Sequence, residues 1–327
     1  MSMFGAIPSP VDERDFKYSL MKEPVALPSE YSLPEWAVNN QNPYGSCVGQ
    51  AASAIKDYQE TKERRVDFDS SPLYVYSHCK KNDGLKEAGT YPREAMKVLL
   101  KNGICTEKTF PHSLMTNDVK PPTPPAAADA EASAYRVASY AQVYSIQDIK
   151  QAIYQDGPVL AAFNWYQSMS SPESGFIPMP YGNYLGGHAI AITGWHDFLT
   201  RNYSQKYKGE TMFTGFFRIR NSWGAAWGLG GYAWIPYKMI TDTAVDVRPL
   251  MEAWTTVDIV ADKAETKREI VITPGAEYAE VDGARVKLDQ PAMLMQDTGR
   301  VMVPLRFVGE AFGWTVEWKN GKAYLNK

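Results

Sequence analysis

The sequence predicts an α+β protein: a two-lobed unit, with a helical lobe, a β-rich lobe and a cleft between them, followed by a small C-terminal α+β domain. Three observations predict this fold class. Apolar residues in the first third of the 327-residue chain recur at helical spacing. The segment that follows consists of short β-rich runs bounded by glycines. The composition changes again near residue 262, where a region with hairpin signals begins.

The helical lobe, residues 33 to about 119, contains three predicted helices. The first begins near Cys47, and the charged run "KERR" ends it. A Ser-Pro pair at 71–72 starts the second helix, and Pro92 lies in the first turn of the third, which ends before Gly103. One face of the first helix carries the apolar or small residues Val48, Ala51, Ala52, Ile55 and Tyr58.

Residues 1–32 precede this lobe and are rich in proline and charge, with little periodicity. We interpret them as an extended arm on the surface. Because proline-rich extended segments lie well in grooves, we expect the arm to pack along the two-lobed unit and to enter or cover its cleft.

The stretch at 120–132 is rich in proline and alanine, and we interpret it as a linker to the β-rich lobe, residues 133–255. "YRVASYAQVY" is strand-like, and Ser145 caps a helix after it. Further strands are predicted in "PVLAAFNW", "HAIAITGWHDF", "TGFFRIRNSW" and "GGYAWIPY". We place His196 after the buried strand "AIAIT", on the surface or in a loop.

Composition narrows the classes of partner. The formal net charge of −3 gives no electrostatic reason to expect nucleic acid or an anionic membrane. No apolar run approaches the roughly 20 residues that cross a bilayer, and no signal peptide is recognisable. The three cysteines and four histidines show neither CxxC nor HxxxH spacing. We therefore expect no metal and no cofactor.

Cys47 is a candidate nucleophile because it stands at a predicted helix N-terminus. Free N–H groups and the helix dipole favour a thiolate there. Gln41 lies across a turn, where its side-chain amide can join the Cys47 N–H in an oxyanion hole. Taken alone, however, a cysteine in this setting is more often a small buried hydrophobe.

Two further motifs supply a base and a residue to orient it. In "GGHAIAITGW", His188 stands at the mouth of a buried strand and can point into a cleft. In "RNSWGAAWGLGGY", Asn221 can hold one ring nitrogen of His188, and Trp223 can cover that bond. Each motif alone also fits a structural role. We interpret His78 and His112 as structural.

"QNPYGSC", "GGHAIAITGW" and "RNSWGAAWGLGGY" together resemble the papain-like cysteine peptidases, in the family's order Gln, Cys, His, Asn. His188 follows Cys47 by 188 − 47 = 141 positions, within the family's usual range of about 130–150. Asn221 follows by 221 − 47 = 174, which the charged insert before it can explain. The resemblance implies a two-lobed papain-like fold and a cysteine endopeptidase that acts on protein or peptide substrates.

The resemblance also assigns substrate contacts and shows departures from the family. Gly89, Thr90, Gly187 and Trp223 occupy substrate-binding positions, although Thr90 replaces a glycine and Gly187 stands where an acid is common. Tyr44 replaces a disulfide cysteine of many secreted members, and Val48 replaces an aromatic residue. Cys79 also stands at a position where a disulfide cysteine is common, with Cys105 as a candidate partner.

Residues 262–327 carry hairpin signals at Asp282-Gly283 and Asn320-Gly321, and contain no histidine or cysteine. Their stretch "VMVPLRFVGEAFGWTVEW" resembles the copper amine oxidase N-terminal domain, a module of exported bacterial proteins. The resemblance implies a cell-wall or surface partner and a secreted or surface location. Two other functions stay open: an amidase or acyl transferase on cell-wall peptides, and an inactive adhesion protein.

Overall fold

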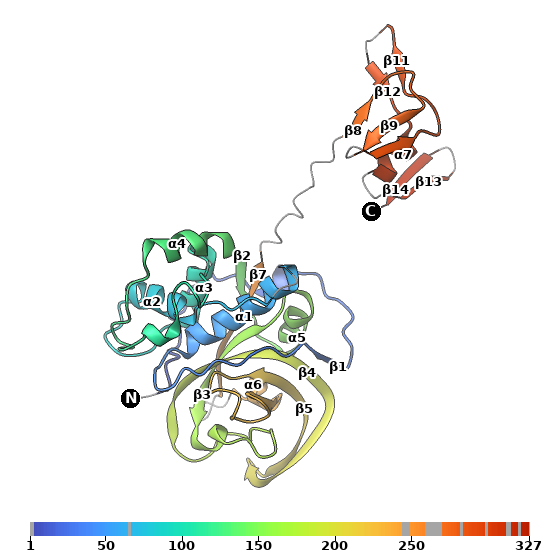
Figure 1. Cartoon of the computed structure of the whole chain (residues 1–327). Coiled ribbons are helices and arrows are strands. Elements are labelled where there is room, and N and C mark those ends of the chain that lie inside the picture. The colour runs from blue at the N-terminus through green and yellow to red at the C-terminus, as the bar shows by residue number, and fades with distance from the viewer. Residues whose placement is uncertain are drawn as a thin grey trace. The chain divides into compact units, whose positions relative to one another are not determined.

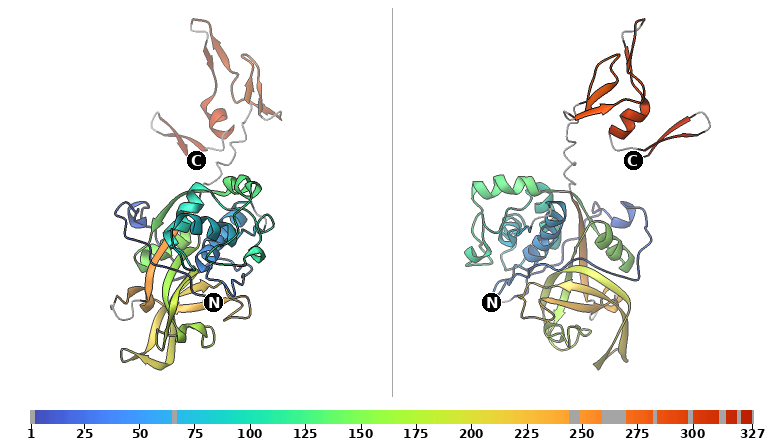
Figure 2. Two further views of the ribbon diagram at one scale, coloured as in Figure 1. Left: turned by 90° about the vertical axis from the view of Figure 1, so that its left-hand side faces the viewer. Right: turned by 45° about the vertical axis from the view of Figure 1, so that its right-hand side comes forward.

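The computed structural model describes residues 3–64, 67–243, 249–258, 270–281, 284–297, 300–311, 315–319 and 322–326. The chain divides into two compact units, Met1–Ile259 and Val260–Lys327 (Figure 1). The larger unit contains a group of helices beside a curved antiparallel sheet, as Figure 2 shows from two further sides. The α+β class predicted from the sequence is therefore correct.

The helical lobe forms where the sequence predicts it. Ser71 caps the second helix by accepting a hydrogen bond from the Tyr74 N–H, and Pro72 follows at the first helical position. Gly103, with φ of 83°, ends the third helix in the left-handed region. The apolar face of the first helix is buried as predicted, except that Tyr58 is half-buried. The helices are α1 (Cys47–Arg64), α2 (Pro72–Asn82), α3 (Pro92–Lys101) and α4 (Ala126–Ala132).

The predicted linker at 120–132 is only partly a linker. Its second half is helix α4, and Ala128 and Ala132 are buried in the core of the helical lobe. Alanine has the highest intrinsic helix propensity, and two small side chains one turn apart fit closely against a neighbour. Part of this low-complexity stretch therefore forms a packed helix.

The β-rich lobe is one seven-stranded sheet with strand order β2-β7-β3-β4-β5-β6, and β1 pairs with β4 beside this path. Helix α5 (Ile146–Gln155) begins after Ser145, which accepts a hydrogen bond from the Asp148 N–H. A short helix, α6 (Lys238–Thr241), follows β6. The strands are β1 (Glu30–Ser32), β2 (Val137–Gln142), β3 (Val159–Tyr166), β4 (Tyr184–Tyr207), β5 (Glu210–Arg220), β6 (Tyr232–Pro236) and β7 (Leu250–Asp258).

The placement of His196 in a loop was wrong. Strand β4 continues through it to Tyr207 and pairs with β5 as a long ribbon. His196 lies 3.0 Å from the Glu30 carboxylate on the neighbouring strand β1. Within this insert Tyr203 and Tyr207 are buried while Lys206 and Lys208 are exposed, so its charge is compatible with a strand exposed on one face.

Residues 1–32 are not simply a surface arm. Tyr18 is buried in the core of the β-rich lobe, and its hydroxyl donates to Asp156 over 2.6 Å. Glu30–Ser32 forms strand β1 of the main sheet. The few apolar residues among prolines and charges give no period, so the sequence pattern does not reveal that they are anchors.

The smaller unit has short hairpins around one helix, α7 (Leu305–Ala311), which packs against strand β13. Its described core is Ala279, Leu288, Ala292 and Phe307. The predicted turn residues Asp282, Gly283, Asn320 and Gly321 lie outside the described residues, but paired strands flank both turns. The strands are β8 (Ile270–Ile272), β9 (Tyr278–Val281), β10 (Ala284–Lys287), β11 (Met293–Met295), β12 (Arg300–Met302), β13 (Thr315–Lys319) and β14 (Lys322–Asn326).

None of the helices in the described part of the chain combines the length and apolarity that a membrane crossing requires.

Candidate active site

Cys47 is the first residue of α1, at the point where the helical lobe meets the sheet. It belongs to a buried cluster that includes Ala189 of β4 and Leu160 of β3, and its side chain is fully buried. This burial raises the pKa of the thiol to about 11, although the backbone N–H groups of Ala189, Gly5 and Val48 act in the opposite direction. In this arrangement Cys47 is a neutral thiol.

His188 and Asn221 form the hydrogen-bonded pair that the sequence predicts. The Nε2 atom of His188 lies 2.7 Å from the Asn221 Oδ1, and the Ser222 N–H donates to the same oxygen over 2.8 Å. Because the amide oxygen accepts, the neutral imidazole carries its proton on Nε2. Its Nδ1 atom is left as the base, and no described residue hydrogen-bonds it. His188 precedes Ala189, whose N–H faces the Cys47 thiol.

Aromatic rings enclose this imidazole. Trp223 stacks on it with ring centroids 4.7 Å apart, and Trp165 meets it edge-on at 4.8 Å. Phe4, from the N-terminal arm, closes a third side at 6.0 Å. Burial lowers the pKa of His188 to about 4, while the bond to Asn221 acts in the opposite direction. The imidazole is therefore neutral beside a neutral thiol.

Gln41 is fully buried and held in one orientation. Its Oε1 accepts a hydrogen bond from the Ser222 hydroxyl over 2.5 Å, which turns its Nε2 the other way. The Nε2 donates to two carbonyl oxygens, those of Tyr44 and Met3, each over 2.8 Å. The predicted oxyanion donor thus binds the peptide carbonyl of an arm residue.

We call residues 3–7 the cleft segment, because they occupy the predicted substrate positions as an extended strand. The Ala6 N–H donates to the Gly187 carbonyl over 2.9 Å. The Thr90 N–H donates to the Gly5 carbonyl over 2.8 Å, and the Ile7 N–H donates to the Thr90 carbonyl over 3.0 Å. These contacts involve only backbone atoms.

Glycine allows the close approach on both sides of the cleft segment. Gly89 has φ of 93°, and a Cβ built there would lie 2.4 Å from the Gly5 carbonyl oxygen. A Cβ at Gly187 would lie 1.9 Å from the Ala6 carbonyl oxygen. The replacement of a family glycine by Thr90 is tolerated because the contacts of Thr90 to the peptide run through its backbone.

The structure brings together all eight residues predicted for the site: Gln41, Cys47, Gly89, Thr90, Gly187, His188, Asn221 and Trp223. The sequence did not identify Phe4, Trp165 or Ser222 as parts of it. Ser222 was identifiable in principle, since it directly follows Asn221 in "RNSW". Phe4 and Trp165 carry no local signal, because only the tertiary fold brings their rings to His188.

Cys79 and Cys105, left open above as a possible disulfide pair, are both free and buried, as is Cys47. The other histidines have structural partners. His78 lies 3.0 Å from Asp129 on α4, and His112 lies 3.1 Å from the Ser46 hydroxyl.

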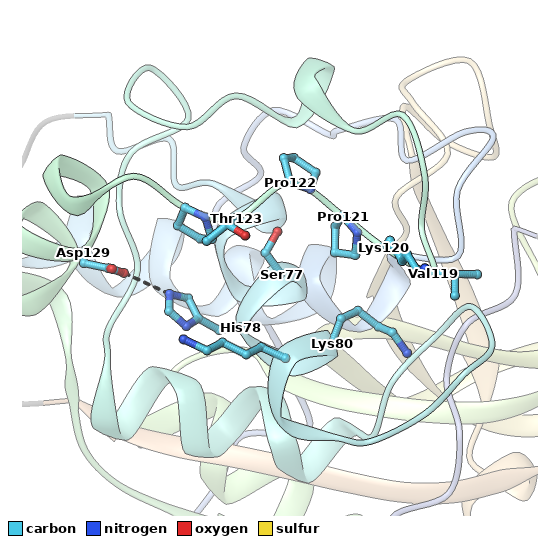
Figure 3. Close-up of a pocket in the computed structure, with 11 residues that line it drawn as sticks. Ser77, His78, Lys80, Val119, Lys120, Pro121, Pro122, Thr123 and Asp129 are labelled. Atoms are coloured by element: carbon cyan, nitrogen blue, oxygen red, sulfur yellow. Dashed lines mark hydrogen bonds and ion pairs between the residues drawn. The ribbon is translucent and has the colours of Figure 1, made fainter.

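A separate pocket of about 360 Å³ lies between α2 and the segment 119–124 (Figure 3). His78, Ser77 and prolines line it, and no residue of the candidate site does. The Lys80 ammonium beside it already donates to the Glu87 and Gly89 carbonyls and pairs with Asp83. This pocket therefore has no part in the chemistry of Cys47.

Comparisons with known proteins agree with this geometry. Residues 32–248 match the family described as papain family cysteine protease. The chain belongs to this family. Residues 240–325 match the copper amine oxidase N-terminal domain.

Individual relatives support the same family. The crystal structure of xylellain, a cysteine protease from Xylella fastidiosa, superposes with a TM-score of 0.63 at 28% identity, over 79% of this chain and 97% of xylellain. A gut-specific cysteine proteinase of Caenorhabditis elegans is 30% identical over 217 residues, 60% of this chain and 62% of the relative. A peptidase C1-like protein of Acanthamoeba polyphaga mimivirus is 28% identical over 220 residues, 62% of this chain and 65% of the relative. The chain spans slightly less than two thirds of these two curated relatives.

Proposed function

We propose that this papain-family protein is a cysteine endopeptidase that hydrolyses peptide bonds through Cys47, His188 and Asn221. One observation supports this above the others: the Met3 carbonyl oxygen accepts a hydrogen bond from Gln41 Nε2 while the adjoining residues run extended beside Cys47. This contact supports the role of Gln41 as an oxyanion donor, because its partner is a peptide carbonyl and nearby backbone groups bind the neighbouring residues. These contacts favour a peptide substrate over other amides.

In the proposed reaction, His188 Nδ1 takes the proton of the Cys47 thiol, and the thiolate sulfur attacks the carbonyl carbon. A C–S bond forms, and the carbonyl oxygen becomes an oxyanion held by Gln41 Nε2 and the Cys47 N–H. The imidazolium then gives its proton to the leaving amine as the C–N bond breaks, which leaves a thioester. Water, deprotonated by His188, hydrolyses the thioester and releases Cys47. Asn221 fixes the imidazole throughout.

The same contacts show what a substrate has to displace. The cleft segment accepts a hydrogen bond from the proposed oxyanion donor Gln41, contacts the thiol through the Gly5 N–H and packs Phe4 against His188. A substrate peptide therefore competes with residues 3–7 for identical hydrogen-bonding groups. We propose that turnover requires this segment to leave the cleft.

The test is cleavage of an internally quenched peptide with both ends blocked, which only an endopeptidase cuts. Cys47→Ala and His188→Ala are expected to abolish turnover, and Asn221→Ala to reduce it strongly. Cys79→Ala is the matched control, because Cys79 is equally buried but does not line the site. Retained turnover in Cys47→Ala would refute the proposal. Activity only on short muropeptides would instead indicate a cell-wall amidase.

A further inference from the structure

Gln50 lies one turn after Cys47 on α1, and its side chain has an unusual environment. The residue is 1% exposed, and neither its Oε1 nor its Nε2 atom has a hydrogen-bond partner in the described structure. A buried amide without partners lowers stability, because the loss of its hydrogen bonds to water is not compensated. The residues around Gln50 indicate which group its side chain can bind.

Gln50 lines a narrow space between α1 and strands β4 and β5. Asn221 and Arg220 line the same space, and the Asn221 Nδ2 and Arg220 Nε atoms also lack partners among the described residues. The space is too narrow to hold a water molecule. These polar atoms can therefore be satisfied only by one another.

A hydrogen bond needs one donor and one acceptor, and this requirement limits which of these atoms can pair. Asn221 Nδ2, Arg220 Nε and Gln50 Nε2 are all donors, so the Gln50 Oε1 is the one acceptor among the unpartnered side-chain atoms described around this space. The Asn221 Oδ1 already accepts from His188 and Ser222, which turns its Nδ2 away from the imidazole. Because Gln50 and Asn221 line the same space, the Gln50 oxygen is the acceptor available to this Nδ2.

We propose that Gln50 is a positioning residue that accepts a hydrogen bond from Asn221 Nδ2 and thereby locks the orientation of the Asn221 amide. This inference deepens the proposed function, because it concerns the same Cys-His-Asn site. The lock keeps the Asn221 oxygen toward His188, so that the imidazole retains its proton on Nε2 and its free base on Nδ1. Without it the amide can flip and present Nδ2, which favours the opposite tautomer.

The first test measures the tautomer directly in the full-length protein, without reliance on turnover. In protein with ¹⁵N-labelled histidine, the His188 ring nitrogens are expected to show the Nε2–H tautomer in the wild type. Gln50→Met removes both polar atoms with little change in volume, and is expected to shift His188 to a mixture of tautomers. Thr255→Val is the control, since Thr255 is fully buried and its hydroxyl is also unpartnered in the described structure. An unchanged His188 spectrum in Gln50→Met would overturn the proposal.

The second test uses kinetics on the same variants. Gln50→Met is expected to lower kcat about tenfold, the size of one hydrogen bond, with KM changed less than about twofold. The hydrogen bond that His188 donates to Asn221 raises the pKa of His188, so its loss is expected to move the acidic limb of the pH profile, where this base becomes protonated, to lower pH. In an Asn221→Ala background, Gln50→Met should have no further effect; additive losses would overturn the proposal. If the wild type shows no turnover, the endopeptidase assignment fails, while the tautomer measurement still decides the role of Gln50.

Discussion

The two parts of the N-terminal arm are held by different kinds of contact. The cleft segment, residues 3–7, uses backbone groups: the Ala6 and Ile7 N–H and the Gly5 and Met3 carbonyls. Residues 9–32, which we call the anchor segment, use side chains and sheet pairing. Ser9 donates to Glu252, Arg93 pairs with Asp15, Tyr18 is buried, and β1 joins β4.

This difference determines which part of the arm a substrate can displace. Any extended peptide offers the N–H and carbonyl groups that the cleft segment offers, so a substrate can replace it without loss of hydrogen bonds. The contacts of the anchor segment depend on particular side chains of this chain, and no generic peptide reproduces them. The arm therefore combines a part that a substrate can displace with a part that keeps it attached nearby.

The largest effect is expected from Gly5→Leu. A Cβ at Gly5 would lie 1.8 Å from the Gly45 carbonyl oxygen, so the cleft segment cannot stay in place. At a pKa of about 11, only about one Cys47 in 10⁴ is a thiolate at pH 7. Once the segment leaves, solvent and the imidazole reach the thiol, its pKa falls, and the rate of Cys47 alkylation at pH 7 should rise about 100-fold or more.

The measurement is the second-order rate of iodoacetamide labelling of Cys47 as a function of pH. The midpoint of the wild-type profile is expected far into the alkaline range, and that of Gly5→Leu near or below neutral pH. Val11→Ala serves as the control, because Val11 lies in the same arm and is 97% exposed. Equal labelling rates for Gly5→Leu and the wild type would show that the cleft segment does not protect Cys47.

A smaller effect is expected from Arg93→Gln, on α3, whose side chain binds the start of the anchor segment. The guanidinium lies 2.7 Å from the Asp15 carboxylate and donates to the Pro10 carbonyl over 2.5 Å, and its side chain is only 8% exposed. Its loss weakens the attachment next to the cleft segment without touching the site. We expect Cys47 labelling at pH 7 to rise about three- to tenfold, the range for one or two hydrogen bonds to a charged group.

The matched control is Arg14→Gln. Arg14 also pairs with an arm carboxylate, Asp12, but its side chain is 90% exposed and its ion pair is screened by solvent. Labelling in this variant should equal that of the wild type. If both arginine variants behave alike, the burial of the Arg93 pair is not what holds the arm.

The site was more predictable from the sequence than the arm, for a physical reason. Cys47, His188 and Asn221 lie in local contexts that chemistry constrains strongly: a helix N-terminus, a glycine-flanked strand and a turn rich in glycine and tryptophan. Their residues could be identified without knowledge of the fold. In the arm, Phe4, Ala6 and Tyr18 are single apolar residues that contact parts of the chain far away in the sequence. Because these residues show no periodicity, the sequence predicted an arm that lies in a groove but did not predict which residues attach it.

Gln50 shows the same limit inside a well-predicted element. Helical periodicity places it one turn after Cys47, yet a glutamine there looks like an ordinary polar residue on a helix. Only the fold reveals that this position is buried and lines the same space as Asn221. Helix α4 is the converse case, because alanine-rich composition alone cannot distinguish a linker from a packed helix.

The smallest effect on the cleft is expected from Tyr18→Phe, in the middle of the anchor segment. The change keeps the buried ring and removes only the hydroxyl, which donates to Asp156 over 2.6 Å and lies 3.1 Å from Gln155. Loss of a hydrogen bond to a charged group should lower the stability of the larger unit by about 1.5–3 kcal/mol. Labelling of Cys47 should change less than about twofold, because β1 and the Arg93 pair still hold the arm.

Thermal unfolding followed by tryptophan fluorescence measures the change in stability, with Tyr144→Phe, at a half-exposed tyrosine, as the control. A large rise in Cys47 labelling with unchanged stability would contradict this prediction. It would mean that Tyr18 keeps the cleft segment over Cys47, rather than attaching the anchor segment to the larger unit.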